Sequence, residues 1–150
     1  MSNEGKLGPN AVWLFALATL GAAIGVTYLI PHITGAITPK AMAAVYFAVF
    51  GLGATLAVVL TRASALRAIG AMAVGGAGLG IFYYIVVART MAAAASELGA
   101  SGSGAAGFGA AMGIVFAVGF AVDALAASIA GALFGSKLRK GLPSPLMAKR

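Results

Sequence analysis

The chain of 150 residues contains no cysteine and only one histidine, His32. The absence of cysteine excludes disulfides, thiolate metal sites and thiol nucleophiles. A bis-histidine haem or a histidine-rich metal site needs more histidine ligands than the one in this chain. We therefore expect no cofactor and no metal ion, and an interfacial hydrogen-bonding role for His32.

The residue sets of the common enzyme classes are also missing. The sequence has no Ser-His-Asp set, no paired carboxylates, no HExxH and no phosphate loop between a strand and a helix. Two glycine-rich runs, 51–53 and 76–80, lie inside apolar segments, which excludes a dinucleotide-binding fold. We expect that this chain is not an enzyme on its own.

Charge is scarce: 9% of the residues are charged and 61% are hydrophobic, with a mean hydropathy of +1.02. Soluble domains carry about 25% charged residues, and a chain of this size could not bury so much apolar surface. The composition therefore predicts a polytopic membrane protein, multi-pass in a cell membrane.

Four apolar segments are long enough to cross a bilayer, whose hydrocarbon core needs about 20 helical residues. They cover residues 11–30, 41–60, 68–88 and 110–134. The first is longer than the apolar region of a signal peptide, so we interpret it as a true span. The predicted fold is an all-α membrane protein, a four-transmembrane-helix bundle forming a single transmembrane domain with a basic tail over 136–150.

Capping residues and helix breakers set the expected boundaries. Pro31 is predicted to stop the first helix, and Thr38 and Pro39 to cap and open the second. Ser64 is the expected N-cap of the third helix. Residues 89–104, which include GASGSG, are predicted to form a flexible loop.

Basic residues are distributed unevenly between the two sides of the predicted bundle. Eight lie in the N-terminus, second loop and tail: Lys6, Arg62, Arg67, Lys137, Arg139, Lys140, Lys149 and Arg150. The first and third loops contain two, Lys40 and Arg89. The positive-inside rule then puts both termini in the cytoplasm. In the tail, Lys137, Arg139 and Lys140 are expected to anchor the chain to anionic lipid headgroups, and we expect no nucleic-acid partner.

Glycine pairs at four-residue spacing predict faces where two helices pack closely, because such pairs lie on one side of a helix. The pairs are Gly21 and Gly25, Gly76 and Gly80, Gly109 and Gly113, and Gly131 and Gly135. Residues 21–30 also align with 76–85, which raises the alternative that the two hairpins are copies of each other. Several of the tyrosines and Trp13 lie near span ends, as in an aromatic belt, whereas Tyr46 is expected to pack inside.

Asp123 is the one ionisable residue within 105–134 and falls near the middle of the fourth span. A carboxyl group at that depth should face protein or water rather than lipid. Its helical face also carries Gly119, Ala126 and Ala130. Asp123 is therefore either a proton or cation site, or a hydrogen-bonding residue that ties helices together through Ser128, Tyr46, Thr55 or a partner subunit.

The combination of four spans, glycine-rich helices, a candidate hairpin duplication and one carboxylate in the fourth span resembles the duplicated proteolipid subunit of rotary ATPases. The resemblance implies that Asp123 binds a transported proton or sodium ion. The charge count gives the opposite orientation, the loops lack that family's polar signature, and the family usually carries Glu at this place.

Two functions therefore remain open. The first is a non-catalytic accessory subunit that docks with other membrane subunits through its glycine faces. The second is a small proton- or cation-translocating subunit, similar to a proteolipid, in which Asp123 titrates.

Overall fold

A computed structural model describes residues 8–34, 39–61, 63–99 and 101–141. A short 3-10 helix, η1 (Pro9–Ala11), leads into four helices: α1 (Val12–Thr34), α2 (Pro39–Leu60), α3 (Ala65–Glu97) and α4 (Gly102–Gly141). Each of the four is long enough and apolar enough to cross a membrane. The prediction of an all-helical chain with four such helices is confirmed. The predicted cap Thr38, and Lys6, Arg62, Lys149 and Arg150, lie outside the described residues.

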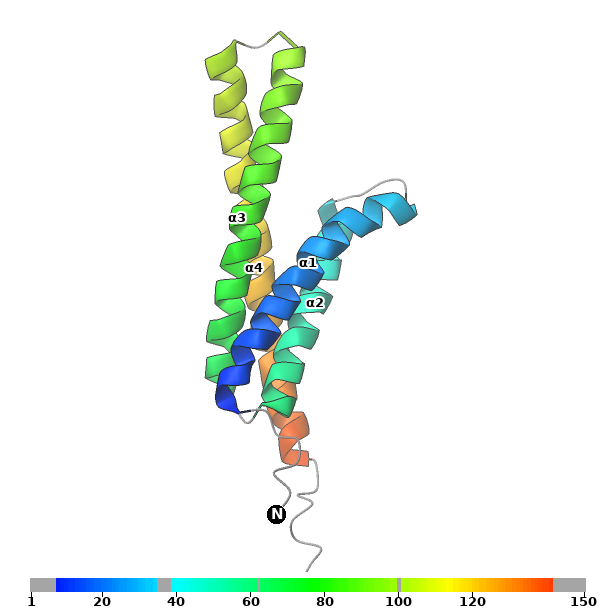
Figure 1. Cartoon of the computed structure of the whole chain (residues 1–150), viewed down its shortest axis with the longest axis vertical. Coiled ribbons are helices and arrows are strands. Elements are labelled where there is room, and N and C mark those ends of the chain that lie inside the picture. Colours follow the sequence, from blue (N-terminus) through cyan, green and yellow to red (C-terminus); the bar gives the residue numbers. More distant parts are fainter. Residues whose placement is uncertain (1–7, 35–38, 62, 100, 142–150) are drawn as a thin grey trace, which may run out of the picture.

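The helices form two antiparallel hairpins, α1 with α2 and α3 with α4 (Figure 1). The most extensive packing joins α4 to α3, and α4 packs next most extensively against α2. Helix α1 lies across α2 and α3. The α3–α4 hairpin extends well beyond the end of the α1–α2 hairpin (Figure 1).

The helix ends follow the local chemistry of the sequence in three places. Ser64 is the N-cap of α3, where its hydroxyl accepts a hydrogen bond from the Arg67 amide at 3.2 Å. Pro39 is the first residue of α2, where a missing N–H is harmless. Gly99 follows the end of α3 with φ of 86°, a left-handed conformation that glycine adopts without strain.

Two predicted helix boundaries were wrong. Helix α1 does not stop at Pro31 but continues to Thr34, and it bends towards that end (Figure 1). Pro31 has no N–H to donate to the Thr27 carbonyl, which weakens the helix there without ending it. The predicted loop over 89–104 is mostly helical, because α3 runs to Glu97 and α4 begins at Gly102. Its alanine-rich sequence favours helix, and α4 packs against this part of α3.

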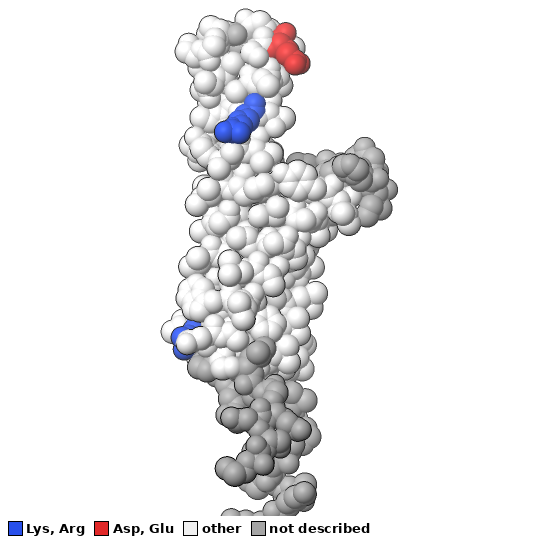
Figure 2. Space-filling model, in the orientation of Figure 1, with Lys and Arg blue, Asp and Glu red and all other residues white. Residues whose placement is uncertain are grey.

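The buried core is small, and most of the bulky apolar side chains point outwards. Tyr46, Phe50, Met72 and Leu79 are the largest fully buried side chains, whereas Leu14, Leu17 and Ile81 are more than 60% exposed. On the face shown in Figure 2, the described surface is uncharged along the middle, between charged side chains near its two ends. This distribution suits a protein whose outer surface contacts lipid.

Candidate functional site

Helix α4 contacts α3 through glycines on both helices. A Cβ atom placed on Gly80 would lie 3.1 Å from the Ala117 carbonyl oxygen, and one on Gly76 would lie 3.1 Å from the Ala124 Cβ. Further along, a Cβ on Gly109 would lie 2.9 Å from the Ala92 amide nitrogen. Gly113 belongs to the same contact, since its Cβ would lie 3.1 Å from the Tyr84 carbonyl oxygen. The two backbones are therefore close along much of this hairpin.

The other half of α4 meets α2 in the same way. A Cβ on Gly131 would overlap the Gly51 carbonyl oxygen and lie 2.8 Å from its carbonyl carbon. One turn on, a Cβ on Gly135 would lie 2.9 Å from the Thr55 carbonyl oxygen. The Thr55 hydroxyl donates across this contact to the Gly131 carbonyl at 3.0 Å. Of its own two glycine pairs, α4 thus packs Gly109 and Gly113 against α3, and Gly131 and Gly135 against α2.

The remaining pair, Gly21 and Gly25, does not enter a contact of this kind. Both glycines are exposed on α1, and no described atom would lie within 4 Å of a Cβ placed on either one. Ala18 and Ala22 are exposed beside them. One face of α1 therefore carries four small residues that the described part of the chain leaves uncovered.

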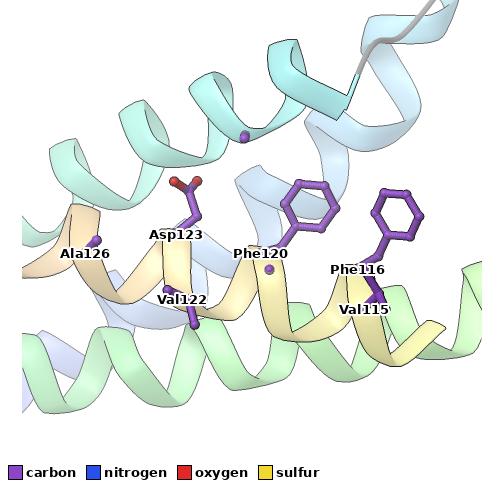
Figure 3. A pocket seen from close by; sticks show the side chains of 8 residues that line it. Val115, Phe116, Phe120, Val122, Asp123 and Ala126 are labelled. Carbon is purple, nitrogen blue, oxygen red and sulfur yellow. The ribbon is translucent and has the colours of Figure 1, made fainter. Parts of the chain in front are cut away.

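Asp123 projects from α4 into an open groove between α4 and α2 (Figure 3). The groove has a volume of about 440 Å³. Its lining residues are Ala43, Val115, Phe116, Gly119, Phe120, Val122, Asp123 and Ala126. The Asp123 side chain is partly buried, and its Oδ2 atom is buried without a hydrogen-bond partner among the described residues.

The hydroxyl groups expected to bond Asp123 are engaged elsewhere. The Ser128 hydroxyl donates to the Ala124 carbonyl at 2.6 Å, within α4. The Thr55 hydroxyl is directed to the carbonyls of Gly51 and Gly131. Tyr46 bonds to groups on α1 and α3, described next. Within the described part of the chain, Asp123 makes no hydrogen bond that ties two helices together.

A hydroxyl cluster joins α1, α2 and α3, and no motif in the sequence predicted it. The Tyr46 hydroxyl is hydrogen-bonded to the Thr27 hydroxyl at 2.5 Å and to the Tyr83 hydroxyl. Thr27 also donates to the Ala23 carbonyl at 2.9 Å. On α4, Phe120 lies against both tyrosine rings, with centroids 5.1 Å from Tyr46 and 4.5 Å from Tyr83. Tyr83 is therefore a core residue and not part of an outer aromatic belt.

Basic side chains gather where α3 begins and α4 ends. Arg139 donates to the Ala63 carbonyl at 2.9 Å, and Arg67 donates to the Asn10 side chain at 2.6 Å. Lys137 and Lys140 are exposed on the last turns of α4. These two hydrogen bonds bring the starts of α1 and α3 and the end of α4 to one end of the molecule.

The described residues hold no group of three or more His, Cys, Asp or Glu side chains that could share a metal ion. The side chain of His32 lies outside the described part of the chain. The functional features of the described residues are therefore a single carboxyl group beside aromatic rings and glycine-rich surfaces for helix contact. Comparisons with protein-family models, curated proteins and solved structures found no match for this chain.

Proposed function

We propose that this chain is a non-catalytic subunit of a larger integral membrane complex, and that it docks through the exposed small-residue face of α1. The observation that carries this proposal is the exposure of Gly21 and Gly25, next to Ala18 and Ala22. Inside a bilayer, helices associate through close packing, and small residues are what allow two backbones to approach. The other three glycine pairs already have neighbours within the described chain, so this pair is the one that remains uncovered.

The distribution of charge supports insertion with both termini in the cytoplasm. Along α3, the stretch from Arg67 to Arg89 rises about 33 Å, close to the thickness of a hydrocarbon core. Arg67 lies at the end that also carries Lys137, Arg139 and Lys140, and these bases suit the anionic headgroups of the cytoplasmic leaflet.

The first experiment is purification from the native membrane in a gentle detergent, followed by mass determination and identification of the co-migrating chains. We expect an assembly that contains unrelated membrane subunits. Recovery of a monomer, or of an assembly of this chain alone, would contradict the proposal.

A pair of glycine substitutions then tests the surface itself. Gly25→Leu adds a bulky side chain to the α1 face and should release the chain from the assembly. Gly70→Leu is the matched control, because Gly70 is also exposed on a helix with no described atom within 4 Å of a built Cβ. Equal retention of both variants in the assembly would rule out the α1 face as the docking surface.

The position of Asp123 favours a second candidate function, a small subunit that translocates protons or cations. A carboxyl oxygen buried without a partner near the middle of a span is a feature of proton and ion pathways. Asp123→Asn should leave assembly intact and abolish proton or sodium flux in reconstituted vesicles. Unchanged flux in this variant, or no flux in the wild-type protein, would remove the candidate.

A further inference from the structure

The groove that holds Asp123 has one polar end and one aromatic wall. Phe116 and Phe120 project from α4 on the same side as Asp123, towards α2 (Figure 3). Their rings are stacked, with centroids 6.1 Å apart and an angle of 27° between the planes. Along the helix axis, Asp123 and Phe116 are separated by about 10 Å. The carboxyl group and the aromatic wall therefore lie side by side within one open groove.

The aromatic wall is held in place by the core behind it. Phe120 is 7% exposed, and its ring lies edge-on to Tyr46 and tilted against Tyr83. Both tyrosines are fixed in turn by their hydrogen bonds to each other and to Thr27. The groove is thus a preformed surface, of the kind that binds small molecules without rearrangement.

The buried oxygen of the carboxyl group accepts no hydrogen bond from the described chain. Its Oδ2 atom is buried and unbonded, and the other lining residues are Ala, Val, Gly and Phe, which have no side-chain donor. An unsatisfied buried oxygen is unfavourable, so a group from outside the chain should supply the hydrogen bond.

The residues that line the groove indicate which kind of hydrogen-bond donor would bind to Asp123. Inorganic cations prefer several oxygen ligands, whereas the described lining contributes one carboxyl group. An ammonium group needs only one carboxylate and forms a strong, charge-assisted hydrogen bond with it. The volume of about 440 Å³ is in the range of small-molecule sites, and its apolar walls suit an apolar body.

We propose that the groove between α2 and α4 is a binding site for a lipophilic amine. The ammonium N–H donates to Asp123, and the apolar part of the ligand lies along Phe120 and Phe116. This site is separate from the α1 face, so the amine-binding proposal can be tested independently of the docking proposal.

The test is a titration of the purified full-length chain in phosphatidylcholine nanodiscs with 4-(4-fluorophenyl)butylamine. Fluorine NMR follows the bound fraction, and empty nanodiscs give the background from partition into lipid. The corresponding alcohol, 4-(4-fluorophenyl)butanol, has the same apolar body without the charge. Asp123→Asn removes the carboxylate, and Glu97→Gln is the matched control, because Glu97 is exposed at the end of α3 outside the groove.

We expect saturable binding of the amine by the wild-type and Glu97→Gln proteins. Affinity should fall by about tenfold or more in Asp123→Asn, and by a similar factor for the alcohol with the wild-type protein. Phe116→Ala should weaken binding without abolishing it, since it removes one wall of the groove. Circular dichroism of each variant checks that the helices are retained.

The proposal is overturned if the wild-type protein gives no saturable binding above empty nanodiscs. It is also overturned if Asp123→Asn binds the amine as tightly as the wild type, or if the alcohol binds as tightly as the amine. Proton or sodium flux is not measured in this experiment, so its result is distinct from that of the translocation test.

Discussion

The two hairpins share a sequence pattern, yet they pack by different means. Residues 21–30 align with 76–85, so Gly21 and Gly25 correspond to Gly76 and Gly80. In the α3–α4 hairpin the glycines lie against the backbone and alanines of the partner helix. In α1 the corresponding glycines face outwards.

This difference follows from the position of α4 in the molecule. Helix α4 packs against both α3 and α2, so α2 makes its closest backbone contact with α4 and not with its hairpin partner α1. Helix α1 instead contacts α2 and α3 mainly through its own side chains: Thr19 lies against Gly53, Leu20 lies against Gly78, and Thr27 is hydrogen-bonded to Tyr46. Glycines with the same spacing therefore form a contact within the chain in α3 and an uncovered surface in α1.

The largest expected effect is at the crossing of α2 and α4. Gly131→Ala places a Cβ against the backbone of Gly51, which cannot move aside as a side chain could. We expect a loss of more than about 3 kcal/mol of unfolding free energy. Unfolding in sodium dodecyl sulfate, followed by circular dichroism, measures it. A wild-type unfolding midpoint in this variant would mean that the two helices do not meet there.

The aligned glycines provide a direct test of the difference between the hairpins. Gly80→Leu inserts a side chain against the backbone of Ala117 and should lower the unfolding free energy by about 2 kcal/mol. Gly25→Leu, at the corresponding place in α1, should leave the unfolding free energy of the isolated chain unchanged or raise it slightly, because leucine favours helix more than glycine does. The same detergent titration compares them, and equal destabilisation by the two variants would contradict the difference in packing.

A smaller loss than at the glycine contacts is expected from the hydroxyl cluster that links α1 to α2 and α3. Tyr46→Phe keeps the ring against Phe120 but removes the bonds to Thr27 and Tyr83. We expect a loss of about 1 kcal/mol, the scale of an interhelical hydrogen bond in a membrane. Tyr84→Phe is the control, since Tyr84 is 40% exposed on α3. If the two variants unfold alike, the cluster contributes nothing measurable.

Much of the fold could be predicted because long apolar runs and capping residues act locally. The four helices and the Ser64 cap follow from such signals. The helical extension over 89–104 was missed because glycine and serine indicated a loop, whereas packing of Gly109 against the Ala88–Ala92 region supports the helix. That contact joins two segments far apart in sequence, so no local pattern contains it.

The site was predictable only in part, for the same physical reason. The position of Asp123 and the small residues on its face can be derived from helical periodicity. Which helix faces them depends on how α4 is rotated and shifted against α2, and this is set by the contact between Gly131 and Gly51. The hydroxyl cluster of Thr27, Tyr46 and Tyr83 depends on the register of three helices at once, and glycine spacing does not identify the neighbour of each pair.

The extension of α3 and α4 past the other hairpin offers a simple readout of orientation. If the membrane boundary lies near Arg89, the end of α3 at Glu97 stands about 12 Å further out, in water. Leu98 follows it and is 88% exposed. Because the chain has no cysteine, Leu98→Cys would carry the sole thiol, and a membrane-impermeant maleimide would label it from only one side. The protruding hairpin would thus report, in intact cells, which way the whole bundle is inserted.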